Sequence, residues 1–289
     1  MVMYAPSELI INADGSAFHL HLKPEQLADR IILVGDQNRV DMVASRFDQI
    51  ECTVQNREFR TITGTKGGKR ISCVSTGIGT DNIDIVLTEL DALANIDFAT
   101  REDRPSFRRL QLVRIGTCGG MQPETPEGTY AASAVSIGFD GLLNYYAGRD
   151  RVCDAGFEQA FVEQTGYSPR FAAPYCVHAS ASLLERIAGT DMVRGATISA
   201  PGFYGPQGRQ IRLPLADPQL NDKIRAFSYQ GMKINNFEME GSAIAGLSAL
   251  LGHEALTVCL VIANRYGRRF IGDYSTKMEE LVSLVTDRL

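Results

Sequence analysis

Short runs of β-branched residues alternate along the chain with segments of helical period, and this alternation most constrains the fold. Helical period marks Asn82–Leu93, and Gly241–Leu251 is rich in small residues that suit close packing. The alternation predicts an α/β fold in which helices cover both faces of a sheet. Six runs are predicted to be buried strands: Ile31–Val34, Ile71–Ser75, Leu110–Ile115, Ala132–Ile137, Ala196–Ser199 and Leu256–Ala263.

Two segments between these runs are expected at the surface. Arg57–Arg70 contains Gly64, Gly67 and Gly68 between alternating stretches, which predicts a hairpin or loop. The charged run Thr100–Arg109 predicts a solvated excursion. The chain shows no long Pro/Ser/Gly linker and no internal repeat, so we expect residues 1–289 to form a single domain.

The charge balance excludes one class of partner. The chain carries 29 Lys and Arg against 34 Asp and Glu, a formal net charge of −5. Such a molecule repels polyanions, so no nucleic-acid partner is expected. A small anionic substrate would need a few arginines concentrated in one cleft.

Cysteine usage and the N-terminus indicate the compartment. The six cysteines form no C-x-x-C pair and only four histidines are present, so no metal site is predicted. The N-terminus has no basic region before an apolar run, and no stretch approaches the ~20 apolar residues that span a bilayer. We therefore expect a cytoplasmic protein with reduced thiols and no membrane partner.

Glycine-rich segments follow three predicted strands, at the edge where open α/β sheets bind ligands. They are Val34–Arg39, Thr76–Gly79 and Arg114–Gly120. No G-x-G-x-x-G lies at a strand-to-helix turn and G-x-x-x-x-G-K-[ST] is absent, so no nucleotide cofactor is predicted. A close backbone approach with Arg39, Arg114 and Thr117 as donors would suit one free phosphate. Ordinary turns with salt-bridged arginines are the alternative.

Two further groups of residues suggest a small-molecule pocket. Phe203, Gln207 and Arg209 lie within one Gly/Pro-rich segment, where a ring could stack on a flat heterocycle while the polar groups bond in its plane. The alternative is a loop with a buried Phe and exposed polar ends. Glu238 and Glu240 would face the same side of an extended segment, or would stabilise the N-terminus of the helix that follows.

Taken together and in order, these segments resemble the nucleoside phosphorylase superfamily, in its uridine phosphorylase branch. The resemblance covers about residues 18–265. It implies a single α/β domain around a mixed, twisted sheet, and phosphate-dependent cleavage of uridine to uracil and ribose 1-phosphate by a pentosyltransferase of pyrimidine salvage. Eight motifs carry it: FHL at Phe18–Leu20, VGDQNRV at Val34–Val40, REF at Arg57–Phe59, STGIG at Ser75–Gly79, RIGTCGG at Arg114–Gly120, FYGPQGR at Phe203–Arg209, FEMEGS at Phe237–Ser242 and NR at Asn264–Arg265.

The resemblance also implies a role for each candidate residue. Arg57 and His19 would reach the site from a neighbouring subunit, in a dimeric or hexameric homo-oligomer with shared active sites. The phosphate-binding residues would be Gly35, Arg39, Arg57, Arg114 and Thr117. The ribose-binding residues would be His19, Glu238, Met239 and Glu240, and the base-binding residues Phe203, Gln207, Arg209 and Arg265.

No cofactor is implied, because inorganic phosphate is a co-substrate. Some relatives bind a monovalent cation at the subunit interface near Glu58 and Ile78, but Asn82 stands here where a Ser is seen, so the ion is not counted among the predicted ligands. Purine-cleaving relatives place an aspartate where this chain has Asn264-Arg265, which favours a pyrimidine substrate. A nucleoside phosphorylase of other base specificity, a nucleosidase and a catalytically silent nucleoside-binding protein remain alternatives.

Overall fold

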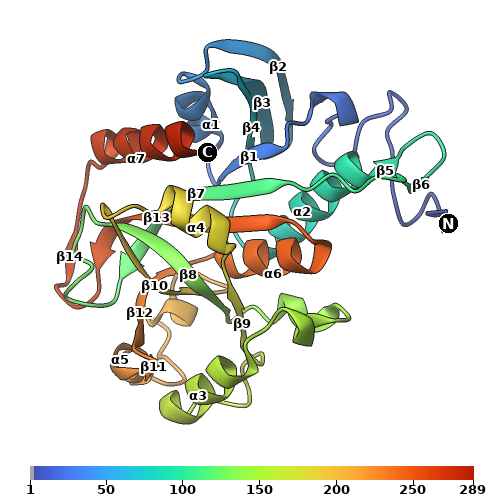
Figure 1. Ribbon diagram of the computed structural model, residues 1–289. Helices are drawn as coiled ribbons and strands as arrows, with labels where there is room; N and C mark the ends of the chain where they lie inside the picture. The colour runs from blue at the N-terminus through green and yellow to red at the C-terminus, as the bar shows by residue number, and fades with distance from the viewer. Residues whose placement is uncertain (1–2) are drawn as a thin grey trace.

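The predicted strand runs lie in one large mixed sheet (Figure 1). The computed structural model describes residues 3–289. All six runs fall within or overlap strands that extend beyond them by a few residues. These are β1 (Arg30–Val34), β4 (Lys69–Ser75), β7 (Gln111–Gly120), β8 (Tyr130–Gly138), β10 (Met192–Ser199) and β13 (Glu254–Asn264).

Six further strands complete this sheet in the described part of the chain. The order is β11-β12-β10-β8-β13-β7-β1-β4-β3-β2, with β14 beside β13 and β9 beside β8. Strands β4 and β7 both run parallel to β1, and β13 runs parallel to β7. In contrast, β13 is antiparallel to β8, and β3 is antiparallel to β4. The predicted mixed sheet is therefore confirmed. The added strands are β2 (Gln49–Asn56), β3 (Phe59–Lys66), β9 (Tyr175–His178), β11 (Ser228–Tyr229), β12 (Met232–Glu238) and β14 (Arg269–Phe270).

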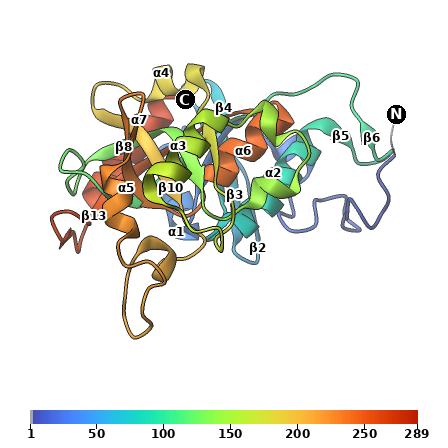
Figure 2. The same ribbon diagram turned by 90° about the horizontal axis from the view of Figure 1, so that it is seen from below.

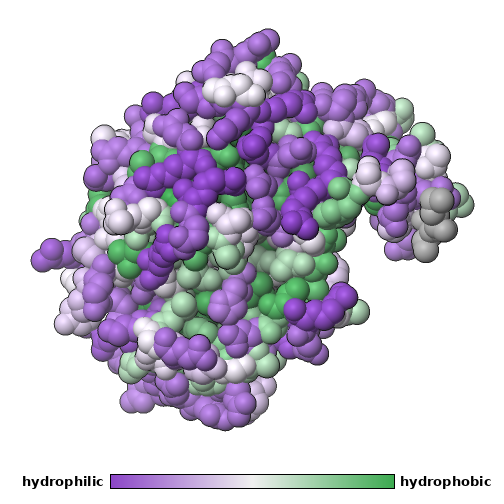
Figure 3. Space-filling view, viewed as in Figure 1, coloured by the Kyte–Doolittle hydropathy of each residue, from purple (hydrophilic) through white to green (hydrophobic). Residues whose placement is uncertain are grey.

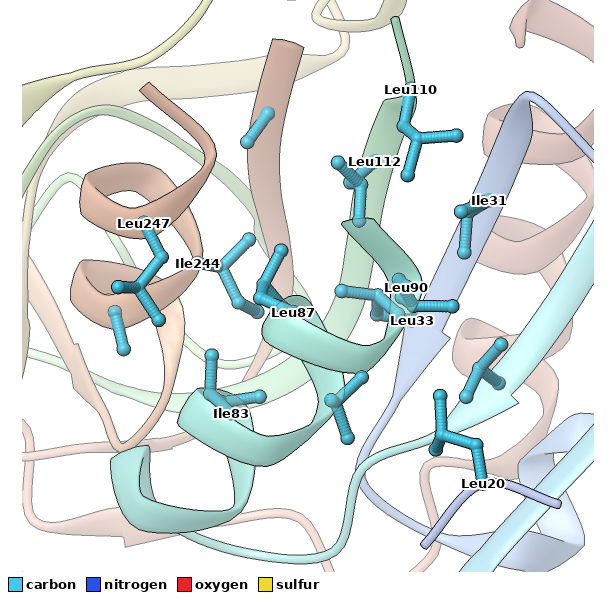
Figure 4. Close-up of a cluster of buried hydrophobic side chains, with 14 of the residues drawn as sticks. Leu20, Ile31, Leu33, Ile83, Leu87, Leu90, Leu110, Leu112, Ile244 and Leu247 are labelled. Atoms are coloured by element: carbon cyan, nitrogen blue, oxygen red, sulfur yellow. The ribbon is translucent and has the colours of Figure 1, made fainter. Parts of the chain in front are cut away.

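Helices cover both faces of the sheet, as the alternation predicts. Alternate residues of β1 point to opposite faces. Ile31 and Leu33 pack in the core that contains α2 (Thr80–Asn95) and α6 (Gly241–Leu251), as Figure 4 shows. Ile32 and Val34 belong to the opposite core, which is covered by α1 (Gln37–Ala44), α4 (Ala181–Ile187) and α7 (Ser275–Arg288).

A third core lies at the β12 end of the sheet. It is aromatic: Phe157 and Phe161 of α3 (Ala155–Thr165) pack against Phe227, which follows α5 (Leu220–Ala226). Short 3-10 turns occur at Pro24–Gln26, Leu142–Tyr145, Arg149–Arg151 and Gly205–Gln207. The segment between β10 and α5 projects from the body of the molecule (Figure 2).

One glycine-rich segment was expected to be a turn, and the structure shows that this is wrong. Residues 114–120 belong to β7, which runs parallel to β13 and also pairs with β12 through Gly119 and Gly120. The close approach of the Arg114 side chain explains the glycine at position 116, because a Cβ there would lie 2.1 Å from Nη1 of Arg114. Glycine is needed for the path of the arginine side chain rather than for a turn.

Both predicted surface segments contain β-strands. Gly67 and Gly68, both at positive φ, make the turn between β3 and β4, whereas Gly64 lies inside β3. The charged run at 100–109 is not a purely solvated excursion, because β6 (Glu102–Asp103) pairs with β5 (Ile96–Asp97).

Figure 3 shows hydrophilic side chains over most of one face, with apolar surface gathered in the lower middle of the view. Within residues 3–289, no helix has the length and apolar character needed to cross a membrane.

Candidate active site

A cavity of about 1130 Å³ gathers most of the predicted site residues. Strand ends and the loops after them form its wall, as expected for an α/β sheet. Arg57 and His19 are the two predicted residues that do not line it. The eleven that do are Gly35, Arg39, Arg114, Thr117, Phe203, Gln207, Arg209, Glu238, Met239, Glu240 and Arg265.

Two arginines and a helix start form one end of the cavity. Gly35 follows β1, and Asp36 caps α1 by accepting a hydrogen bond from the Asn38 amide at 3.0 Å. Arg39, in the first turn of α1, donates to the Ile115 carbonyl at 3.3 Å and forms no ion pair with any residue in 3–289. Burial and the nearby charge of Arg114 lower the pKa of Arg39. An uncompensated cation beside a helix N-terminus suits an anion.

Arg114 is buried between two carboxylates. Its Nη2 donates to Glu240, and its Nη1 lies 3.1 Å from Oε2 of Glu238 and donates to Sγ of Cys259 at 3.3 Å. Burial alone would lower the pKa of Arg114, but Glu240 and Glu238 raise it well above its usual value. Arg114 is thus the salt-bridged arginine of the alternative interpretation, whereas Arg39 forms no ion pair within residues 3–289.

Glu238 performs the helix-capping role that the sequence left open. It ends β12, and its Oε2 accepts hydrogen bonds from the amides of Glu240 and Gly241, each at 2.8 Å. Its Oε1 accepts from the hydroxyl of Ser199. Both oxygens are therefore engaged, and a negative charge sits at the N-terminus of α6, where it is stabilising.

Glu240, like Glu238, lines the cavity. Its Oε1 accepts from the Gly79 amide at 2.7 Å, and its Oε2 accepts from Arg114. Burial raises the pKa of Glu240, and the Glu238 carboxylate adds to this, while Arg114 opposes both effects. Met239, between the two glutamates in sequence, also lines the cavity.

The other end of the cavity is built around Gln207. The side chain of Arg209 donates to Oε1 of Gln207 at 2.7 Å and lies 3.7 Å over the Phe203 ring, and Arg265 donates to the Gln207 carbonyl at 3.0 Å. Phe203 is 50% exposed and Gln207 only 3%, the reverse of an ordinary loop with a buried Phe. Burial and the charge of Arg265 lower the pKa of Arg209 to about 10.

Asn264, at the end of β13, belongs to the Asn264-Arg265 pair on which the expectation of a pyrimidine substrate rests. Its Nδ2 donates to the carbonyls of Gln122 at 3.1 Å and Thr125 at 2.7 Å, and its Oδ1 accepts from the Gly267 amide. The amide group is used fully by the backbone, so it is not free to donate to a base.

Arg57 and His19 lie together outside the cavity of their own chain. Arg57 is exposed, and its guanidinium lies 5.9 Å from the centre of the Phe18 ring. The Phe18 and His19 rings are in edge-to-face contact at 4.8 Å. Glu58, next to Arg57 in sequence, does line the cavity.

Several lining residues were missed by the sequence analysis. Asn221 donates to the Gln207 carbonyl at 3.1 Å from α5, and Arg225 stacks 5.6 Å from the Tyr266 ring. Nothing in the sequence marks them, because only tertiary packing brings α5 and the segment after β13 to the cavity. The missed residues include Asn221, Asp222, Arg225, Arg268, Arg269 and Phe270.

The described residues offer no cluster of metal ligands. Within residues 3–289, no group of three or more His, Cys, Asp or Glu side chains could hold a metal ion. Asn82 donates to Oε1 of Glu58 at 3.4 Å, so an amide group faces this carboxylate. An interface cation would have to compete with that amide.

Comparisons with known proteins identify the family of the chain. The family model of the phosphorylase superfamily matches residues 29–288. A solved structure of a Trypanosoma brucei nucleoside phosphorylase that shows uridine phosphorylase activity is similar over 97% of this chain and 99% of its own, with 31% identity and a TM-score of 0.88. A uridine phosphorylase of Thermococcus kodakarensis is 27% identical over 89% of this chain and 80% of its own. A DeoD-type purine nucleoside phosphorylase of Aliivibrio fischeri is 25% identical over 93% and 95%. The chain belongs to the phosphorylase superfamily.

Proposed function

We propose that this chain is a uridine phosphorylase, which cleaves the N-glycosidic bond of uridine with phosphate to give uracil and ribose 1-phosphate. One observation carries the proposal: a single cavity is lined by Arg39 and Thr117, by Glu240, and by the Phe203–Gln207–Arg209 group. The names of the Thermococcus kodakarensis and Trypanosoma brucei relatives support it.

The base end fits a pyrimidine that leaves with negative charge. Uracil carries an N3–H donor between two carbonyl acceptors, which an amide and guanidinium groups can match. Arg209 and Arg265 form no ion pair within residues 3–289, so their charge is uncompensated before the reaction. As the glycosidic bond breaks, this charge stabilises the developing anion more than the neutral ground state.

The opposite end would hold the nucleophile. Phosphate bound by Gly35, Arg39, Arg114 and Thr117 would be held close to C1′, so binding supplies proximity and the phosphate charge stabilises the oxocarbenium-like ribosyl group. Bound phosphate would compete with Glu240 for Nη2 of Arg114. Glu240 would then be released to accept hydrogen bonds from the ribose diol, beside the apolar Met239.

The same proposal includes an assembly with shared sites, a dimer or a hexamer, in the cytoplasm. Arg57 and His19 lie together on the surface and outside their own cavity, which supports their delivery to the cavity of a neighbouring subunit. Ile78, which lines the cavity, is 70% exposed and would be covered by such a neighbour.

The test is release of uracil from uridine with and without phosphate. We expect release only with phosphate, and no cleavage of inosine or adenosine. Arg209→Gln should lower kcat/KM for uridine by at least ~10-fold, because a charged partner of the base is lost. Arg212→Gln, on the exposed part of the same segment, is the matched control and should behave as wild type.

Each other outcome identifies an alternative. Release without phosphate would indicate a nucleosidase, and preference for a purine would contradict the base assignment. Uridine binding with no turnover in phosphate would indicate a silent nucleoside-binding protein.

A further inference from the structure

Glu89, a residue of α2 that the sequence analysis did not select, holds the segment around His19. Its two carboxylate oxygens accept hydrogen bonds from the His19 amide at 2.9 and 3.1 Å and from the Leu20 amide at 2.8 Å. The same carboxylate lies 2.6 Å from Nδ1 of the His19 ring. The Glu89 side chain is only 13% exposed, so water competes weakly for these bonds.

This contact determines which nitrogen of His19 carries the proton. An ionised carboxylate has no hydrogen to donate, so the hydrogen of this bond must be on Nδ1. In the neutral ring, Nε2 is then left with a lone pair. No residue within 3–289 forms a hydrogen bond with Nε2 of His19.

A second histidine shows the opposite arrangement and serves as an internal contrast. Nδ1 of His253 accepts a hydrogen bond from the Leu110 amide at 3.2 Å, so this nitrogen has no hydrogen. Nε2 of His253 lies 3.0 Å from Asp91, which is also on α2, and must donate to it. The two histidines are therefore expected to be different neutral tautomers.

The His19 ring is also fixed in orientation. Phe18 contacts it edge-to-face at 4.8 Å, and the Phe59 ring lies 6.4 Å away at 81°. Asn56 donates to the His19 carbonyl at 2.8 Å, which holds the backbone. The free Nε2 lone pair is thus presented in a defined direction on the surface that carries Arg57.

We propose that Glu89 is a positioning residue that makes His19 a hydrogen-bond acceptor at Nε2, and that this favours nucleosides whose 5′ oxygen can donate a hydrogen over nucleosides whose 5′ oxygen can only accept one. The selection rests on the proposed function, in which His19 reaches the ribose of a neighbouring site. A 5′-hydroxyl can donate to Nε2. A 5′-O-methyl oxygen has no hydrogen to donate, so two lone pairs would face each other.

The tautomer is measured directly by nitrogen–proton correlation NMR on protein with ¹⁵N-labelled histidine, at about pH 8.5, where an ordinary histidine is neutral. We expect wild-type His19 to carry hydrogen on Nδ1 and His253 on Nε2. In Glu89→Gln, the amide oxygen is retained by the backbone amides and its NH₂ group faces Nδ1, so His19 should change to the Nε2–H form. Asp91→Asn, a matched change on the same helix, should leave His19 as in wild type.

The selectivity is measured as the ratio of kcat/KM for uridine to that for 5′-O-methyluridine. Wild type and Asp91→Asn should prefer uridine by at least ~10-fold, because the Nε2 lone pair then faces an oxygen that has no hydrogen to donate. The preference should fall to about 3-fold or less in Glu89→Gln, where Nε2–H can donate to the ether oxygen.

A wild-type His19 with hydrogen on Nε2 would overturn the proposal, as would full discrimination by a Glu89→Gln variant whose tautomer has changed. The wild-type spectrum needs no variant, so the test survives if Glu89→Gln does not fold. Absence of any uridine cleavage would contradict the proposed function instead, and the spectrum would still decide the effect of Glu89 on His19.

Discussion

At the scale of single residues, the central fact is that one buried guanidinium serves two buried carboxylates. Arg114, Glu238 and Glu240 are 4%, 3% and 4% exposed, so water screens the contacts of the guanidinium with the two carboxyl groups weakly. Removal of Arg114 would leave two buried carboxylates without a cation, a change of the kind that costs about 3–5 kcal/mol. Variants of Arg114 therefore report on folding as much as on catalysis.

Glu240→Gln tests the proposed contact with ribose more directly than a variant of Arg114 does. The change keeps the shape and leaves Arg114 paired with Glu238, so the fold should persist. The charged acceptor for the diol is lost, and kcat/KM for uridine should fall at least ~10-fold. Steady-state kinetics with a thermal melt of each protein checks this. Glu124→Gln, at an exposed surface pair with Lys233, is the control, and an unchanged kcat/KM in Glu240→Gln would refute the ribose assignment.

Asn264→Asp should not create a purine phosphorylase. The Asn264 amide donates to two carbonyls, and a carboxylate there would face both oxygens with no hydrogen to give. The variant should lose about 1–3 kcal/mol of unfolding free energy and gain no activity on inosine or adenosine. Urea unfolding and a purine-cleavage assay measure the two effects. Measurable inosine cleavage by a stable Asn264→Asp protein would show that base choice depends on this position alone.

The site residues were predictable where one side chain carries the chemistry. The Phe203–Gln207–Arg209 segment contains ring, amide and guanidinium within seven residues, and the structure brings all three together. The capping of α6 by Glu238 and the hydrogen bonds between Glu89 and His19 were not predictable. Each depends on two elements far apart in sequence whose register only the folded chain defines.

At the scale of elements, six strands and the two helices were predictable from period. The ends of α6 match the predicted range Gly241–Leu251, whereas those of α2 and of the strands differ from the predicted ones by a few residues. The run of residues 114–120 looked like a turn because glycines usually mark turns. Tertiary pairing with β12 and β13 kept it extended, and Gly116 is required by a neighbouring side chain instead. The segments 96–103 and 220–226 carry too little period to reveal β5, β6 or α5.

A bidentate ion pair holds the C-terminal end of α7, and its contribution to the unfolding free energy should depend on pH. Arg288 donates to both oxygens of Asp191, at 3.0 and 2.9 Å, and this hydrogen bonding lowers the pKa of Asp191 below its usual value of 3.8. A lowered carboxyl pKa gives stability that is present above the unfolded value and is lost as pH falls through the folded one.

Asp191→Asn should therefore lower the unfolding free energy at pH 7 by at most ~1 kcal/mol, because the pair is partly exposed. The difference from wild type should shrink toward zero as the pH falls from above 3.8 through the lowered pKa of Asp191. Urea unfolding of both proteins at pH 7 and at a pH well below 3.8 measures this difference in unfolding free energy. A gap that persists in acid would mean that the Asn side chain disturbs packing and that the ion pair is not the cause.

At the scale of the whole molecule, the shared site proposed above would have a consequence that a single-chain site lacks. Arg57→Ala and Glu240→Gln homo-oligomers should each be nearly inactive, since every site lacks one group. In a mixed dimer, one site collects both defects and the other has neither. Purified, doubly tagged heterodimers should show about half of the wild-type activity per dimer. Activity at the level of the parents would mean that Arg57 does not act across the interface.

The surface position of Arg57, Phe18 and His19 also bears on inhibitor design. If each cavity borrows two groups from its neighbour, an isolated chain is an incomplete catalyst, and specific activity falls on dilution once subunits separate. A ligand that caps the Phe18 ring and holds subunits apart would then inhibit without resembling a nucleoside or entering the cavity. Excess uridine would not relieve such inhibition, whereas a higher enzyme concentration would.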